Sequence, residues 1–72
     1  MSTKTENSKN DLYIFEKDGQ LVEKVAYRNN LQSEINKLSG EKLSELIKSD
    51  DFDGFIKSAN ALGYRIYKVI EL

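Results

Sequence analysis

The sequence predicts a small α+β domain in two layers, a three-stranded antiparallel sheet with helices on one of its faces. Three observations support this fold class: a hairpin signal near the beginning of the chain, helical periodicity in the middle, and alternating apolar residues at the end. The chain has 72 residues, enough for one domain at most. We expect the element order ββαααβ, with two or three helices between the hairpin and the last strand.

Residues 1–10 contain a single apolar residue, Met1, among Ser, Thr, Asn, Lys and Glu. Because this segment has almost no apolar surface to bury, we expect a disordered tail at 1–10 and one domain at 11–72. The segment also lacks the apolar region of a secretory signal, and no stretch of the chain reaches the roughly 20 apolar residues that span a bilayer. We therefore expect a cytoplasmic protein that does not bind membranes.

A β-hairpin over residues 11–29 is the first predicted element. Residues 12–15 and 21–27 are rich in leucine, β-branched and aromatic side chains, a composition that favours strands. Asp18 and Gly19 lie between these two segments, and Asp-Gly in such a place is a strong hairpin signal.

Two turns fit this hairpin. A two-residue type I′ turn pairs Lys17 with Gln20, whereas a type I turn with a bulge at Gly19 pairs Glu16 with Gln20. The two registers differ by one residue, which changes the faces on which the side chains meet, and the sequence allows both.

Three helices are predicted in the middle of the chain. Asn29 or Asn30 caps the first helix, and Ser39 caps the second, unless the two helices merge across Gly40. The third helix follows residues 49–51, and the carboxylates of Asp50, Asp51 and Asp53 lie where they can cap it and complement its dipole. The apolar residues that define the three helical stripes are Leu31, Ile35 and Leu38, then Leu43, Leu46 and Ile47, then Phe52, Phe55, Ile56, Ala59 and Leu62.

The last predicted element is a strand over residues 64–72. It directly follows Gly63, a residue that suits the left-handed position behind a helix. Two hairpin strands alone are marginally stable, so we expect this third strand to join them in an antiparallel sheet. The sequence leaves open whether it pairs with the first or the second hairpin strand.

Missing residue types exclude several classes of function. The chain has no cysteine and no histidine, so it contains neither a Ser-His-Asp nor a Cys-His catalytic site and no thiolate zinc site. Five acidic residues gather between Glu41 and Asp53, but they suit helix capping better than a calcium loop, whose glycine and glutamate positions are not met. We predict a protein that is not an enzyme and has no catalytic residue, cofactor or metal.

The strands are apolar on both faces, which is the strongest functional signal in the sequence. One helical layer covers one face of a sheet, so we expect the other face to keep large apolar side chains exposed. Such a face predicts an interface for a partner protein or for a second copy of the chain, in a homodimer. The residues predicted to form it are Tyr13, Phe15, Arg65, Tyr67 and Val69. The small size and polar beginning are typical of a regulator or inhibitor encoded by a mobile genetic element such as a phage.

Two other functions are alternatives. In a nucleic-acid-binding module, the strand aromatics stack on bases while four cations hold the phosphates: Lys24, Arg28, Arg65 and Lys68. The net charge of -1 provides no general attraction for nucleic acid, so we do not favour this alternative. In a small enzyme, carboxylates or tyrosines do the chemistry, but a chain of this size offers little room for the deep pocket that tunes them.

Overall fold

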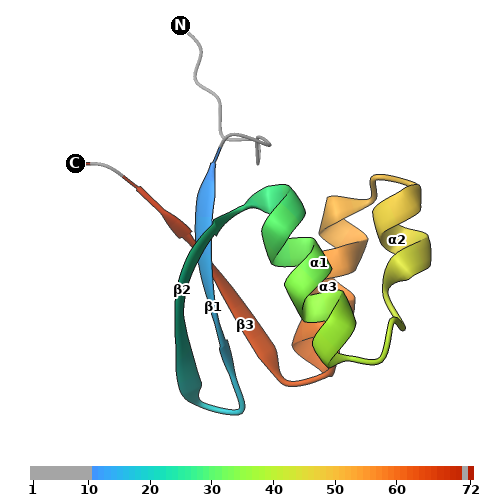
Figure 1. The fold of residues 1–72 in the computed structure, drawn as a ribbon, viewed down its shortest axis with the longest axis horizontal. Coiled ribbons are helices and arrows are strands. Elements are labelled where there is room, and N and C mark those ends of the chain that lie inside the picture. Colours follow the sequence, from blue (N-terminus) through green and yellow to red (C-terminus); the bar gives the residue numbers. More distant parts are fainter. Residues whose placement is uncertain (1–10, 71) are drawn as a thin grey trace, which may run out of the picture.

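The structure confirms the two-layer α+β fold, with the sheet and the helices in separate layers (Figure 1). The computed structural model describes residues 11–70 and 72, so the tail expected at 1–10 lies outside the described residues. The elements along the chain are β1 (Leu12–Lys17), β2 (Gln20–Tyr27), α1 (Arg28–Leu38), α2 (Ser44–Lys48), α3 (Phe52–Ala61) and β3 (Tyr64–Val69).

β1 lies at the centre of the sheet, in the order β2-β1-β3, and both of its pairings are antiparallel. The C-terminal strand β3 therefore pairs with the first strand of the hairpin. It ends at Val69, so it is shorter than the expected strand over 64–72. α1 packs on β1 and β2 while α3 packs on β3, and both helices lie on the same side of the sheet (Figure 1). α2 connects them and packs on α3.

The hairpin turn is the two-residue type I′ form. Asp18 and Gly19 both have positive φ angles, 52° and 85°, and Lys17 pairs with Gln20. Farther from the turn, the β1–β2 pairing shifts its register, whereas the β1–β3 pairing runs from Leu12 to Lys17 without a shift. The edge formed by β2 is therefore irregular and the edge formed by β3 is regular.

The prediction that Asn29 or Asn30 caps the first helix is wrong. α1 begins at Arg28, its N-cap is Tyr27, and no side chain makes a capping hydrogen bond there. Tyr27 is also the last residue of β2, so the strand runs directly into the helix. The packing of β2 and α1 on the same core, rather than a local cap, decides where this helix begins.

The prediction that Ser39 begins the second helix is also wrong. Ser39 is the C-cap of α1, and its hydroxyl donates a hydrogen bond to the carbonyl oxygen of Asn36 (3.0 Å). Gly40 and Glu41 follow with φ angles of 78° and 62°, so the chain turns away and the two helices do not merge. α2 begins only at Ser44.

The inward faces of the strands and the apolar stripes of the helices form one core. Aromatic rings lie at its centre: the ring centroids of Tyr13 and Phe52 are 5.6 Å apart, and those of Phe15 and Tyr64 are 6.0 Å apart. Leu38 belongs to the predicted helical stripe, but it lies exposed at the C-terminal end of α1. The buried apolar residues are Tyr13, Phe15, Leu31, Ile35, Leu43, Phe52, Phe55, Ala59 and Tyr64.

A contact between two turns fixes the end of the sheet near the hairpin. Gly63, between α3 and β3, has a φ of 98°, and its carbonyl oxygen accepts a hydrogen bond from the backbone N–H of Asp18 (3.0 Å). A Cβ atom at position 63 would lie 2.5 Å from Oδ1 of Asp18, whereas a Cβ atom at Gly40 meets nothing within 4 Å. Glycine is therefore favoured at position 63 by the positive φ, and a Cβ atom there would also make the exposed carboxylate of Asp18 move aside.

We expect Gly63→Ala to lower the free energy of unfolding by about 1 to 2 kcal/mol, because it strains a positive φ and also moves the exposed carboxylate of Asp18, which pairs with Lys17. Gly40→Ala is the matched control, since it adds the same methyl group at positive φ in open space, and we expect it to cost about 1 kcal/mol. Urea unfolding followed by circular dichroism measures both changes. Equal losses in the two variants would show that the carboxylate of Asp18 moves aside at no measurable cost.

Candidate functional site

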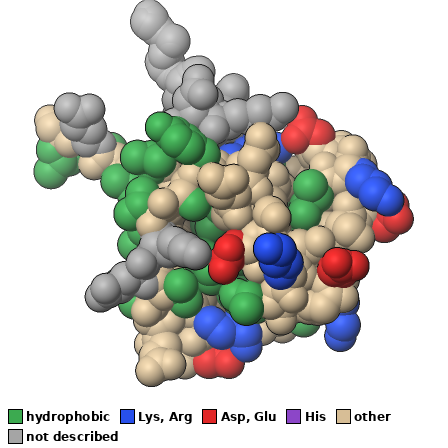
Figure 2. Space-filling model, in the orientation of Figure 1, with side chains coloured by type: hydrophobic (Ala, Val, Ile, Leu, Met, Phe, Trp, Pro, Cys, Tyr) green, Lys and Arg blue, Asp and Glu red, His purple; other side chains and the backbone are tan. Residues whose placement is uncertain are grey.

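The face of the sheet opposite the helices is the main candidate site. Strand pairing assigns eight residues to this outward face: Leu12, Ile14 and Glu16 of β1, Leu21 and Tyr27 of β2, and Arg65, Tyr67 and Val69 of β3. Figure 2 shows hydrophobic side chains gathered over the strands, on the left of the molecule, while charged side chains lie mainly over the helices. The helical layer thus leaves an apolar surface uncovered on the other side of the sheet.

Apolar side chains form the middle of the outward face. Ile14 of the central strand is half-buried and lies directly opposite Tyr67, which is 44% exposed. Leu12 lies between Tyr27 on one side and Val69 on the other. Side chains that lie directly opposite each other on antiparallel strands are in contact distance, so these residues form a continuous patch.

The charged residues of the outward face lie at one end, near the hairpin turn. Glu16 and Arg65 are opposite each other in the β1–β3 pairing. Their charges are of opposite sign, so the described outward face has no net charge. A surface of this kind suits a partner that is neither strongly acidic nor strongly basic.

The prediction that Tyr13 and Phe15 belong to the exposed face is wrong. Both are buried beneath the helices, 2% and 1% exposed, because Phe15 lies opposite Ile66 and both side chains point into the core. The same pairing places the other three predicted residues, Arg65, Tyr67 and Val69, on the outward face, as predicted. The structure thus separates the five predicted residues into two on the inner face and three on the outward face.

Sequence reasoning missed the contribution of Leu12 and Ile14 to this face. One signal was available in the sequence. Residues two apart on a strand share a face, so the charged Glu16 indicates that Ile14 and Leu12 lie on the solvent side. By the same rule, the charged Lys17 indicates that Phe15 and Tyr13 lie on the solvent side, so the charge pattern of this strand is ambiguous. The structure shows how Lys17 is accommodated there: its ammonium lies 5.2 Å from the ring centroid of Tyr64, at the rim of the core.

Among the described cations predicted for nucleic acid, Arg65 shares the outward face with the exposed Tyr67, whereas Arg28 and Lys68 do not lie on that face. Arg28 is buried, and its guanidinium pairs with the carboxylate of Asp50 (2.6 Å). Lys68 points to the helical side of the sheet and forms an ion pair with Asp11 (3.3 Å). Arg65 is placed on the outward face beside an acidic residue, and the side chain of Lys24 lies outside the described part of the chain. This placement gives the nucleic-acid alternative no support.

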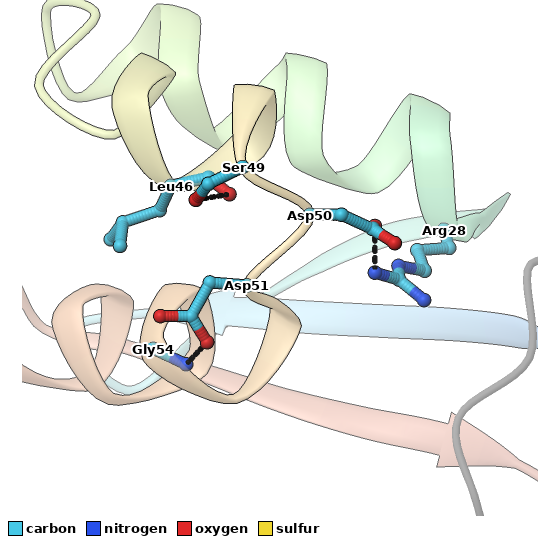
Figure 3. A network of polar contacts seen from close by, with 6 residues as sticks. All are labelled: Arg28, Leu46, Ser49, Asp50, Asp51 and Gly54. Carbon is cyan, nitrogen blue, oxygen red and sulfur yellow. Dashed lines mark hydrogen bonds and ion pairs between the residues drawn. The ribbon is translucent and has the colours of Figure 1, made fainter.

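The buried Arg28 joins the beginning of α1 to the turn between α2 and α3 (Figure 3). Its guanidinium carbon lies 4.3 Å from the ring centroid of Phe52, so one partner is a carboxylate and another is an aromatic face. A buried cation requires such partners, because an uncompensated charge inside a protein is strongly unfavourable. Arg28 therefore has a structural position in this fold and is not an exposed ligand-binding cation.

The acidic residues between Glu41 and Asp53 also have structural positions. Asp51 is the N-cap of α3, and its Oδ1 accepts a hydrogen bond from the backbone N–H of Gly54 (2.9 Å; Figure 3). Asp53 lies in the first turn of α3, where a carboxylate complements the helix dipole. Among the described residues, no group of three or more acidic side chains is placed to hold a metal ion.

Comparisons of the chain with protein-family models, with curated proteins and with solved structures found no match. A function must therefore be argued from the chemistry of the surfaces described above. Within residues 11–70, no helix is long and apolar enough to cross a membrane.

The core contains buried polar atoms that lack a hydrogen-bond partner, and the hydroxyl of Tyr13 is one of them. It is buried and has no hydrogen-bond partner among the described residues. Burial raises the pKa of this hydroxyl above its ordinary value of 10.0, the carboxylate of Asp11 raises the pKa further, and the charge of Arg28 lowers it. The side chain of Tyr13 thus contributes its ring to the core, while its hydroxyl is desolvated without compensation.

We expect Tyr13→Phe to leave the free energy of unfolding unchanged or to raise it by up to about 1 to 2 kcal/mol, because it removes an unpaired buried hydroxyl. Because the folded-state pKa of Tyr13 is raised, its ionisation favours the unfolded chain once the pH exceeds about 10. The wild-type protein should therefore lose more stability than Tyr13→Phe between about pH 9 and pH 11.5 in urea unfolding. A parallel loss in the two proteins would show that the hydroxyl is not desolvated as described.

Proposed function

We propose that the protein is a non-catalytic interaction module, a small regulator or inhibitor that binds a protein through the outward face of its sheet. The observation that carries this proposal is the uncovered apolar patch around Ile14 and Tyr67. Exposed apolar patches of this kind are a recurring feature of protein interfaces. Aromatic side chains at the centre with charged residues at the rim are also typical of interfaces.

The size of the outward face limits what it can bind by itself. Three strands of about six residues cover roughly 300 Å², from the usual strand spacing and rise. Burying that area contributes on the order of 7 kcal/mol before the cost of association. A stable interface takes about 800 Å² from each partner, so the outward face would supply the apolar centre and neighbouring surfaces the rest.

The charge of the face distinguishes this proposal from the nucleic-acid alternative. Glu16 and Arg65 offset each other, so protein binding here depends little on ionic strength. Nucleic-acid binding would weaken steeply with salt, because it releases counterions from the phosphates. The same salt titration therefore separates the two functions.

The first step in testing this proposal is to find a binding event whose affinity can be measured, either with a partner protein or between copies of the chain. Light scattering from about 10 μM to 1 mM measures self-association, and isothermal titration calorimetry measures binding to any captured protein. We expect Tyr67→Ser and Val69→Ser each to weaken that binding about tenfold to a hundredfold, since both remove apolar contact area from the outward face.

Leu38→Ser is the matched control for these substitutions. Leu38 is 58% exposed, comparable to Tyr67 and Val69, but it lies at the end of α1 on the helical side of the sheet. We expect Leu38→Ser to bind like the wild type. If Tyr67→Ser and Val69→Ser are folded and bind every partner as tightly as Leu38→Ser does, the outward face is not the interface.

A further inference from the structure

β3 is an edge strand with a regular backbone. It pairs with β1 over its whole length without a register shift, and within the described residues no strand lies on its other side. No turn, loop or cap in the described part of the chain makes a backbone hydrogen bond to residues 64–69. The N–H and C=O groups along this edge are therefore available to another strand.

A hollow of about 380 Å³ lies on the helical side of this edge. Its lining includes Ile66 and Lys68 from β3 and Asp53, Ile56 and Lys57 from α3, together with two aromatic rings of the core. No residue of α1 or β2 contributes to it. Because α3 packs on β3 while α1 packs on β1 and β2, the hollow lies at the β3 side of the domain.

The hollow has an apolar floor, and two lysines and one aspartate lie at its rim. Ile56 and Ile66 supply apolar surface, and two of the three charged lining residues are lysines. Lys57 is exposed and forms no ion pair with any described residue, whereas Lys68 is held by Asp11 at 3.3 Å. An apolar side chain and a neighbouring carboxylate would complement this lining.

We propose that β3 and the hollow form a binding site for an extended peptide segment of a partner protein, which adds to the sheet as a fourth strand. The peptide backbone pairs with the edge of β3. Because strand side chains alternate, every second side chain of the peptide points to the helical side. One apolar side chain enters the hollow between Ile56 and Ile66, and an acidic side chain of the peptide binds Lys57.

This site is distinct from the outward face, and its occupant is selected by charge. Lys68 points inward near the C-terminal end of β3, and an inward charge on an edge strand opposes pairing with apolar strands in general. Asp11 already pairs with Lys68 (3.3 Å), so Lys57 is the cation that remains for a carboxylate of the peptide. The peptide side chains that point the other way would lie beside Tyr67 and extend the outward face.

The test uses the full chain, labelled with ¹⁵N, and a panel of acetylated and amidated seven-residue peptides. In each peptide valine or isoleucine occupies the inward positions, threonine the outward positions, and a single glutamate is moved through the inward positions across the panel. We expect members of the panel to shift the amide signals of β3 and of α3 around Lys57 in titrations to about 2 mM. Peptides N-methylated on the edge that faces β3 should not bind, because they cannot pair.

Two variants test the charge selection. Lys57→Glu should weaken binding of the acidic peptides about fivefold to tenfold and favour peptides in which lysine replaces the glutamate. Lys42→Glu makes the same charge change at an exposed position between α1 and α2 and should bind like the wild type. The proposal is overturned if no peptide of the panel shifts these signals, if N-methylated peptides bind equally well, or if the shifts fall on the outward residues of β1 and β2 and spare α3. Concentration-dependent shifts of β3 without peptide would instead assign the edge to a second copy of the chain.

Discussion

The alternation of side chains along β1 decides which residues lie on each face of the sheet. Among the described strands, β1 is the only one that is paired on both sides. Its two pairings place Tyr13 and Phe15 beneath the helices and leave Leu12 and Ile14 on the other side. The helices form a single layer, so they bury the first pair and cannot cover the second. The apolar outward face is thus a direct consequence of strand alternation in a chain with one helical layer.

Two contacts between segments that are far apart in the sequence join the elements of the domain. At the hairpin end, the backbone of Asp18 meets Gly63. At the opposite end of the helices, Arg28 joins Asp50 and the ring of Phe52. Each contact lies where a helix or strand begins or ends. The same residues therefore limit the elements along the chain and join them in space. The surfaces left for binding are those that neither contact occupies, namely the outward face and the edge of β3.

Local chemistry made part of this fold predictable from the sequence. The Asp18-Gly19 turn, the cap at Asp51 and the glycine at position 63 each follow from a short-range rule, and the structure confirms all three. The cap predicted at Asn29 or Asn30 failed because β2 continues directly into α1. The face of β1 was not predictable for a similar reason: the register between β1 and β3 decides it, and that register depends on contacts between distant segments.

The most direct test is the solvent exposure of side chains on the two faces, measured by NMR with a soluble paramagnetic agent. In the dilute protein we expect strong relaxation of Leu21, Tyr67 and Val69 and little effect on Tyr13 and Phe15. When a partner or a second copy is bound at saturation, the first group should become protected. Strong relaxation of Tyr13 and Phe15, or an outward face that stays fully exposed in the saturated complex, would contradict the assignment of this face as the interface.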